Sequence, residues 1–190
     1  MFKINNSILM ESFKNKKPIA LPTDTVYGIF YPIGERNKQY INEIKNSPPN
    51  KFISVMFASV EQATPYLKLS NQHLSLISAN LPGHATIIVK TSDLGKEMFE
   101  QKTVGVRIPS TKDAKQLVEF LEEHGPMFAS SANLSGNKAL NTRREIIKEF
   151  ENEIYVPMLK RPKTSIRNPE SSLMIDLTSG GFDIIRHGKA

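Results

Sequence analysis

The amino-acid sequence predicts an α/β fold, because its hydrophobic residues alternate repeatedly between helical spacing and the short β-branched runs of strands. The chain has 190 residues, enough for one ordinary domain but short for two, so we expect a single domain over residues 1–190. With 39% hydrophobic and 23% charged residues, the composition is that of a globular protein rather than a disordered chain. No apolar run approaches the roughly 20 residues that a membrane-spanning helix needs.

Two helices and four strands are predicted in the first half of the chain. The N-terminal helix is indicated by apolar residues at helical spacing, namely Ile4, Ile8, Leu9 and Phe13. A second, short helix is indicated by Tyr40, Ile41 and Ile44. Apolar and β-branched runs predict strands at residues 19–21, 29–33, 53–57 and 86–89.

The second half contains the clearest helix and four further strands. This helix is expected to begin at Ser110, where Ser110-x-x-Asp113 resembles a capping box, and to end at Gly125. A second box, Thr142-x-x-Glu145, predicts another helix start. The further strands are expected at residues 104–108, 127–130, 173–177 and 182–186. Residues 160–171, with two prolines and four cations, are predicted to be a mobile basic segment that closes over a ligand as a lid.

Composition excludes several classes of chemistry. The chain has no Cys, so it has no disulfide, thiolate zinc site, iron–sulfur cluster or Cys nucleophile. The N-terminus lacks the pattern of a secretory signal, and we therefore expect a cytoplasmic protein. A net charge of +6 favours anionic partners such as nucleotides or nucleic acid. P-loop, dinucleotide-binding and zincin motifs are missing, and the four His residues lack metal-binding spacing, so no protein-held metal is expected.

The segment LPTDTVYG, residues 21–28, places polar side chains directly after a predicted strand. The hydroxyls of Thr23 and Thr25 and the carboxylate of Asp24 precede Gly28, which lets a ligand approach the backbone closely. Ligands usually bind at strand ends of α/β sheets, so this segment is a candidate site. The alternative is a turn whose Asp and Thr side chains bind local N–H groups.

Two other segments combine strand ends with cations or hydroxyls. In KNSPPNK, Lys45 and Lys51 flank two prolines and are suited to phosphates, although such lysines are often only solvated. In FASSANLSG, residues 128–136, a strand leads into hydroxyls and an amide, which suits hydrogen bonding to ribose, base or phosphate. The alternative there is an ordinary Ser-rich loop.

Arg107 is the most informative single residue, because it lies in the otherwise apolar strand of TVGVRIP. A buried charge without a partner costs several kcal/mol, so Arg107 needs an anion. Either a ligand carboxylate or phosphate, or a structural salt bridge, would satisfy its guanidinium.

Together and in this order, PTDTVYG, VGVRIP, SSANLSG and the final strands around SSLMIDLT and IIRHG resemble the YrdC/Sua5/YciO family. The likeness spans residues 17–188, and the best-known members of the family are threonylcarbamoyl-AMP synthases. It implies a single YrdC-like domain with a twisted mixed β-sheet, surrounding helices and a basic concave cavity. It also implies an enzyme that condenses L-threonine, bicarbonate and ATP into L-threonylcarbamoyladenylate and pyrophosphate, for the N6-threonylcarbamoyladenosine modification at position 37 of tRNA.

The resemblance also implies roles for individual residues. Lys45 and Arg107 are the implied catalytic residues, and Lys45 lines the phosphate region. The implied threonine-binding residues are Thr25, Arg107, Ser131 and Ser172. The implied ATP-binding residues are Lys51, Thr103, Asn133, Asn141 and Arg186. Mg²⁺ is expected to bridge the phosphates of ATP. Further implied partners are tRNA or double-stranded RNA and proteins of the tRNA-modification pathway.

Two positions depart from the family pattern. The Lys-x-Arg pair of the family is here Lys45-Asn46-Ser47, and the loss of one charge-assisted hydrogen bond costs about 1.5–3 kcal/mol. Met56 stands where synthases often have His. Ser47 keeps open an alternative, a YciO-like protein that binds nucleotide or double-stranded RNA without making the adenylate. A carbamoyl-transferring relative of hydrogenase maturation proteins is disfavoured, and the short C-terminus predicts that the additional domain of longer Sua5 proteins is absent.

Overall fold

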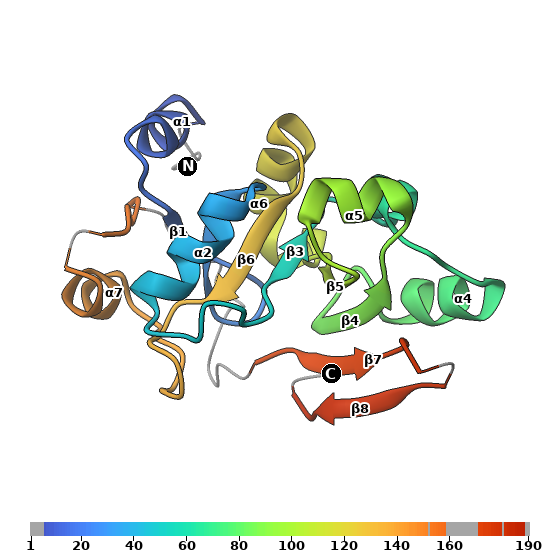
Figure 1. Cartoon of the computed structure of the whole chain (residues 1–190). Coiled ribbons are helices and arrows are strands. Elements are labelled where there is room, and N and C mark those ends of the chain that lie inside the picture. Colours follow the sequence, from blue (N-terminus) through green and yellow to red (C-terminus); the bar gives the residue numbers. More distant parts are fainter. Residues whose placement is uncertain (1–5, 152, 159–170, 180, 189–190) are drawn as a thin grey trace.

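One mixed β-sheet of eight strands forms the centre of the molecule (Figure 1). The computed structural model describes residues 6–151, 153–158, 171–179 and 181–188. The strand order is β1-β2-β6-β3-β5-β4-β7-β8. The strands are β1 (Ile19–Pro22), β2 (Tyr27–Pro32), β3 (Ser54–Met56), β4 (Ala85–Lys90), β5 (Thr103–Arg107), β6 (Met127–Ser131), β7 (Leu173–Asp176) and β8 (Asp183–Arg186). The expected α/β fold with a mixed sheet is confirmed.

Helices surround this sheet. They are α1 (Asn6–Lys14), α2 (Glu35–Ile44), α3 (Val60–Ala63), α4 (Asn71–Asn80), α5 (Asp93–Phe99), α6 (Thr111–His124) and α7 (Arg143–Glu149), with a 3-10 turn η1 (Thr64–Tyr66) after α3. The sequence predicted α1, α2, α6 and α7 but not α3, η1, α4 or α5. In Figure 1, α1 and α7 lie at one end of the molecule and the β7–β8 hairpin lies beside β4 towards the other end.

The strand pairing explains how distant segments meet. β3 pairs with β5, and β4 with β7, in parallel, whereas all the other paired strands are antiparallel. In this register Arg107 of β5 lies between Met56 of β3 and Thr86 of β4, and Thr86 lies opposite Met174 of β7. Because directly opposite residues point to the same side of a sheet, these four side chains share one face.

The two faces of the sheet bury different clusters. One face carries Val55, Ile87, Val104 and Val106, all fully buried in the larger hydrophobic cluster. The opposite face carries a smaller cluster in which β1, β2, β3 and β6 pack against α6 through residues such as Leu117. The strand predicted at residues 104–108 is confirmed as β5, and Arg107 lies on the face that α6 covers only in part.

The start of α6 differs from the sequence expectation. Ser110 is the N-cap residue, but its side chain makes no capping hydrogen bond, so the predicted Ser110-x-x-Asp113 box is wrong. The backbone N–H of Ser110 instead donates to the carboxylate of Asp24, 2.9 Å away. A distant acid thus occupies the start of α6, and Ala114 in its first turn has non-helical backbone angles. The second predicted box is confirmed, because Thr142 and Glu145 cap α7 reciprocally.

Three expectations concern the ends of the chain and its basic segment. Ile4 and residues 160–170 of the predicted lid lie outside the described residues. The N-terminal helix is confirmed as α1. Among the described helices, none has both the length and the apolar character needed to cross a bilayer.

Candidate functional site

A cavity of about 240 Å³ lies on the face of the sheet that carries Arg107. Its described lining comes from the loops after β1, α2 and β6, from the face of the sheet, and from the β7–β8 hairpin. The lining residues are Thr23, Thr25, Val26, Gly28, Lys45, Lys51, Phe52, Ile53, Ser54, Met56, Thr86, Arg107, Ala129, Ser130, Ser131, Asn133, Ser171, Ser172, Met174 and Arg186. A basic cavity implied by the sequence resemblance is therefore present.

The charge of this lining has a single sign. Lys45, Lys51, Arg107 and Arg186 line the cavity, and no Asp or Glu is among its described lining residues. Hydroxyl groups of Thr and Ser residues provide most of the other polar atoms. Cations and fixed hydroxyls at close quarters favour carboxylate and phosphate ligands, because charge-assisted hydrogen bonds are stronger than neutral ones.

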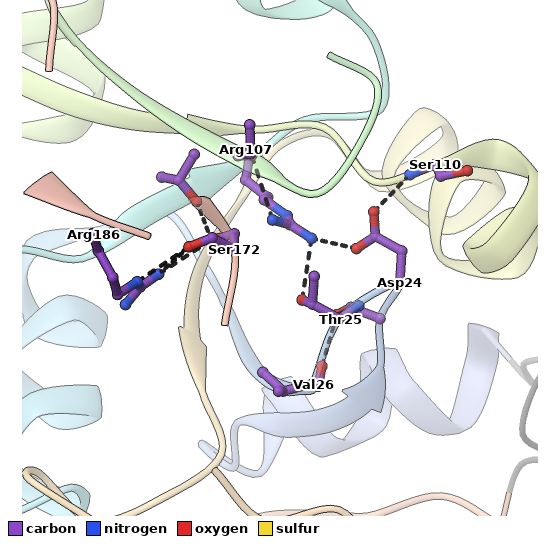
Figure 2. A network of polar contacts seen from close by, with 10 residues as sticks. Asp24, Thr25, Val26, Arg107, Ser110, Ser172 and Arg186 are labelled. Atoms are coloured by element: carbon purple, nitrogen blue, oxygen red, sulfur yellow. Dashed lines mark hydrogen bonds and ion pairs between the residues drawn. The ribbon is translucent and has the colours of Figure 1, made fainter. Parts of the chain in front are cut away.

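Arg107 is held by three protein acceptors (Figure 2). Its Nη2 donates to Asp24 Oδ1, in an ion pair with almost no solvent exposure, and to Thr25 Oγ1 at 3.1 Å. Its Nη1 lies 3.4 Å from the backbone oxygen of Ala85. The sequence left open whether Arg107 binds a ligand or a structural carboxylate. The structure shows that Asp24 is its carboxylate partner and that Arg107 also lines the cavity.

The hydroxyl of Thr25 has a fixed orientation. Thr23 Oγ1 donates its only hydrogen to the backbone oxygen of Val26, at 2.7 Å, because a carbonyl can only accept. The 3.1 Å contact between the two Thr hydroxyls must therefore be a bond that Thr25 donates to Thr23. Thr25 thus accepts from Arg107 and donates to Thr23, so the loop orients Arg107 through contacts within the protein itself.

Gly28 belongs to the same region but has a packing role as well. It lines the cavity on β2, as its position in the sequence predicted. A Cβ atom at this position would lie 2.8 Å from the ring of the fully buried Phe30 and 3.3 Å from the methyl group of Thr23. The missing side chain therefore lets the loop pack closely on the strand beside the cavity.

Lys45 extends from the end of α2 into the loop that follows β6. Its side chain is almost fully buried, and Nζ donates to the backbone oxygens of Ser131 and of Asn133, the latter at 2.6 Å. Burial, with a smaller contribution from the charge of Lys51, lowers the pKa of Lys45 to about 7. Lys51 is more exposed, and its Nζ donates to Ser135 Oγ at 2.8 Å. The two lysines therefore join the KNSPPNK and SSANLSG segments at one side of the cavity.

Asn133 turns its amide group inside the same loop. Its Nδ2 donates to the backbone oxygens of Leu134 and Asn137, at 2.7 and 2.9 Å. Its Oδ1 is buried and has no hydrogen-bond partner within the described part of the chain. The amide of Asn133 therefore stabilises the conformation of this loop at the wall of the cavity.

The β7–β8 hairpin supplies the remaining wall (Figure 2). Arg186 donates to the backbone oxygen of Ser172 through Nε and Nη2, at 3.1 and 3.0 Å, and Nη2 also contacts Ser172 Oγ at 3.2 Å. Ser172 Oγ in turn forms a 2.7 Å hydrogen bond with Thr86 Oγ1. Desolvation first, and then repulsion from Arg107, lowers the pKa of Arg186. Both guanidinium groups line the cavity, so an anion bound there would reduce the repulsion between them.

Eight of the residues singled out in the sequence meet at this cavity, namely Thr25, Lys45, Lys51, Arg107, Ser131, Asn133, Ser172 and Arg186. Thr103 and Asn141 do not line it. Thr103 lies at the opposite end of β5 from Arg107, paired with Lys90. Asn141 precedes α7, where its backbone N–H donates to Glu145 Oε2 at 3.1 Å. The ATP-binding roles expected for Thr103 and Asn141 stay predictions.

The two residues that depart from the family pattern, Met56 and Ser47, lie at different positions relative to the cavity. Met56 lines the cavity beside Arg107. Ser47 is not a lining residue, and its Oγ is buried without a hydrogen-bond partner among the described residues. The hydroxyl of Ser47 therefore does not substitute for a phosphate-binding guanidinium.

Two polar residues, Asp24 and Thr86, have contacts at the site that were not predicted from the sequence. The sequence places Asp24 in a polar loop and predicts that Arg107 needs an anion, but it does not show that these two residues form an ion pair. The available signal for this pair was a charged Arg in an apolar strand together with an Asp in a separate polar loop. Thr86, which fixes Ser172, gave no signal, because a Thr in an apolar strand is common.

The fold and the cavity together define a class of protein: an α/β protein with a cation-lined cavity on one face of a mixed sheet, a kind of cavity that suits small anionic ligands. The profile of the family Sua5_yciO_yrdC, described as "Telomere recombination", matches residues 11–188. The chain therefore belongs to the YrdC/Sua5/YciO family, as the sequence resemblance predicted.

Individual relatives cover most of the chain. The uncharacterized protein YciO of Escherichia coli is 30% identical over 174 residues, which are 90% of this chain and 82% of that protein. The threonylcarbamoyl-AMP synthase of Vibrio campbellii is 26% identical over 186 residues, 95% of this chain and 97% of the synthase. The crystal structure of Pyrococcus abyssi Sua5 complexed with L-threonine has a TM-score of 0.80 at 26% identity, covering 96% of this chain and 54% of that one.

Proposed function

We propose that this protein is an L-threonylcarbamoyladenylate synthase, a nucleotidyltransferase that forms threonylcarbamoyl-AMP and pyrophosphate from L-threonine, bicarbonate and ATP. The observation that carries the proposal is the cavity itself, where eight residues implied by the family resemblance meet; four of them are cations, and no carboxylate is among the described lining residues. Threonylcarbamoyl-AMP synthases among the relatives, and the related Sua5 structure with L-threonine, support the choice of substrates.

The threonine side of the cavity is assigned to the loop after β1, the ends of β5 and β6, and the residue that precedes β7. Arg107 is the proposed partner of the threonine carboxylate, and Thr25, Ser131 and Ser172 provide its hydroxyl surroundings. Both N–H groups of Arg107 Nη2 already have acceptors in the described structure, in Asp24 and Thr25. A bidentate grip that uses Nη2 would therefore replace the longer bond to Thr25.

The phosphate side is assigned to Lys45, Lys51, Asn133 and Arg186. The carbamate that forms from threonine and CO₂ attacks the α-phosphorus of ATP, and pyrophosphate leaves. This reaction brings anionic groups together, so the site must orient them and neutralise the growing charge. Cations at both sides of the cavity are suited to that task, and no covalent nucleophile is required.

Mg²⁺ is proposed to enter the site with ATP. Within the described residues, no group of three or more His, Cys, Asp and Glu side chains is placed to hold a metal ion. The cavity lining likewise contains no carboxylate in the described part of the chain. The donor set therefore suits a cation that is carried by the phosphates of the substrate, where it would neutralise their charge.

The test is direct product formation. Purified protein is incubated with ATP, Mg²⁺, bicarbonate and isotopically labelled L-threonine, and the labelled adenylate and threonine-dependent pyrophosphate are measured. We expect both products, and loss of both in Arg107→Gln. A folded protein that binds RNA but forms no adenylate would reject the synthase and favour the alternative.

The alternative is a YciO-like protein that binds nucleotide or double-stranded RNA without synthase activity. It is favoured by the higher identity to YciO of Escherichia coli and by Ser47, whose buried hydroxyl makes no contact with the cavity. Both functions place this protein in the cytoplasm as one domain over residues 1–190, with tRNA or other RNA and modification-pathway proteins as further proposed partners.

The substitution Ser47→Arg tests whether position 47 belongs to the phosphate side of the cavity. If the position belongs to the phosphate side, an added guanidinium provides a charge-assisted hydrogen bond of about 1.5–3 kcal/mol, and synthase activity stays equal or rises. Activity is measured as threonine-dependent pyrophosphate release, with Ser47→Gln as the uncharged control of similar length. A lower activity in Ser47→Arg than in Ser47→Gln would remove this position from the phosphate side.

A further inference from the structure

Asp24 lies on the side of the Arg107 guanidinium opposite to Ser172 and Arg186, two residues of the cavity lining (Figure 2). Its side chain has no solvent exposure, and Asp24 is not one of the lining residues. A ligand in the described cavity therefore touches Arg107 but not the carboxylate that is paired with it. This separates Asp24 from the residues that the proposed function assigns to substrates.

The carboxylate is fixed at both oxygens (Figure 2). Oδ1 accepts from Arg107 Nη2, and Oδ2 accepts from the backbone N–H of Ser110 at the start of α6. The N-terminus of a helix favours a negative charge, so α6 stabilises the ionised carboxylate as well as orienting it. Asp24 consequently connects three elements: the loop after β1, the end of β5 and the start of α6.

Arg107 needs such an anchor because it lies among other cations. Repulsion between Arg107 and Arg186 is strong enough to contribute to the lowered pKa of Arg186. The cavity contributes no carboxylate from its described lining that could counter this repulsion. Thr25 and the backbone oxygen of Ala85 are neutral acceptors and provide direction, but they do not provide charge.

We propose that Asp24 is the positioning residue of the site: it holds the guanidinium of Arg107 from behind, so that Arg107 meets the carboxylate of an amino-acid substrate in one fixed orientation. The choice of an amino acid rests on the proposed function, whereas the positioning of Arg107 does not. Asp24 acts through Arg107 and makes no contact with the ligand.

The experiment combines two measurements on Asp24→Asn, Arg107→Gln and the double variant, with Asp93→Asn as a matched control at an exposed carboxylate. Calorimetry gives the affinities for L-threonine and for L-threoninamide, which lacks the carboxylate. Side-chain NMR of the arginine Nε–H groups, without any ligand, reports whether Arg107 is ordered. Its resonance is identified by its loss in Arg107→Gln.

Wild type and Asp93→Asn are expected to prefer L-threonine over L-threoninamide by roughly tenfold or more, the size of one charge-assisted hydrogen bond. Asp24→Asn should lose most of this preference and should shift or broaden the Arg107 resonance. In the Arg107→Gln background, adding Asp24→Asn should leave the threonine affinity unchanged, because the residue through which Asp24 acts is already gone.

Three results would overturn the inference. An unchanged preference together with an unchanged Arg107 resonance in Asp24→Asn would show that Arg107 needs no anchor. A further loss of threonine affinity in the double variant would show that Asp24 acts by another route, and this comparison still decides if Asp24→Asn alone fails to fold. If the wild type does not bind L-threonine, the proposed function fails, but the positioning role is still tested by NMR. In that case an unchanged Arg107 resonance in Asp24→Asn would reject the positioning role.

Discussion

Lys45 is a buried cation whose protonation is sensitive to what the cavity holds. Its pKa lies at about 7, because burial and the nearby Lys51 disfavour the charged form. Below pH 7 Lys45 is therefore charged in the free protein, and above pH 7 it is mostly neutral. An anion placed against it favours the charged form, so binding above pH 7 takes up a proton, and the apparent affinity falls as the pH rises.

The first prediction concerns the binding of MgATP by wild type and Lys45→Met. Between about pH 6.5 and about pH 8, the ratio of wild-type to variant affinity should fall by up to about tenfold, since each pH unit above the pKa costs at most about 1.4 kcal/mol. Calorimetry at several pH values measures the ratio, in which the titration of ATP itself cancels. Lys68→Met at the surface serves as the control. A ratio that does not change with pH would show that Lys45 lies outside the phosphate side.

At this scale, the sequence indicated which residue types gather but not how they pair. The hydroxyl and cation segments at strand ends made Thr25, Ser131 and Lys51 candidate ligand contacts, the family resemblance implied that they share one site, and all three line the cavity. Because a buried Arg107 needs an anionic partner, a ligand anion and a structural carboxylate were both physically reasonable partners. Only the three-dimensional arrangement shows Asp24 behind it, because the contact joins residues 83 positions apart, and residue spacing alone does not report such pairs.

Helix starts show how an element depends on contacts beyond its own sequence. Two similar boxes occur, at Ser110 and at Thr142, and only the second forms. Thr142 accepts from the backbone N–H of Glu145 at 3.1 Å, a bond within the helix itself. At α6 the N-cap backbone N–H is taken by Asp24, and the first turn deviates at Ala114, so the local box is replaced by a tertiary contact.

This difference makes a paired prediction about stability. Thr142→Ala should lower the free energy of unfolding by about 1 kcal/mol, the usual contribution of an N-cap side chain. Ser110→Ala should change it by less than about 0.5 kcal/mol, because the Ser110 side chain makes no capping bond. Urea denaturation measures both. Equal losses in the two variants would mean that the Ser110 hydroxyl caps α6 in solution.

The strands could be predicted from the sequence far better than the helices between β3 and β5. Buried runs such as Val104 to Ile108 are almost uninterrupted, and their bounds agree with the observed strands to within two residues. α4 has a polar sequence in which only Ile77 is buried, so it lacks a clear apolar face. α5 contains Gly95, which usually weakens a helix. Here a Cβ atom would lie 2.0 Å from the backbone oxygen of Tyr66, so packing against η1 requires the glycine.

At the scale of the whole molecule, the cavity is lined by two parts of the sheet that differ in burial, namely the central strands and the β7–β8 hairpin. Its central strands are buried, whereas every residue of β8 is exposed. Among the described strands, β8 lies at the edge of the sheet and pairs only with β7, and this pairing has a register irregularity between Met174 and Ile175. Ser172 and Arg186, which line the cavity, nevertheless come from this hairpin (Figure 2). The site is therefore completed by the part of the sheet that we expect to open most easily.

Hydrogen exchange tests this link between the hairpin and the ligand. Without ligand, amides of β7 and β8 should exchange faster than those of β4 and β5, because exposed edge strands open locally at lower free energy. Saturating MgATP should slow exchange in β7 and β8, since Arg186 would then bind the ligand as well as Ser172. In Arg186→Gln this protection should disappear from the hairpin, whereas in Lys51→Gln it should persist once the ligand concentration is raised to saturation. Equal protection of the hairpin in both variants would show that ligand binding does not act through Arg186, and that the hairpin forms a passive wall of the cavity.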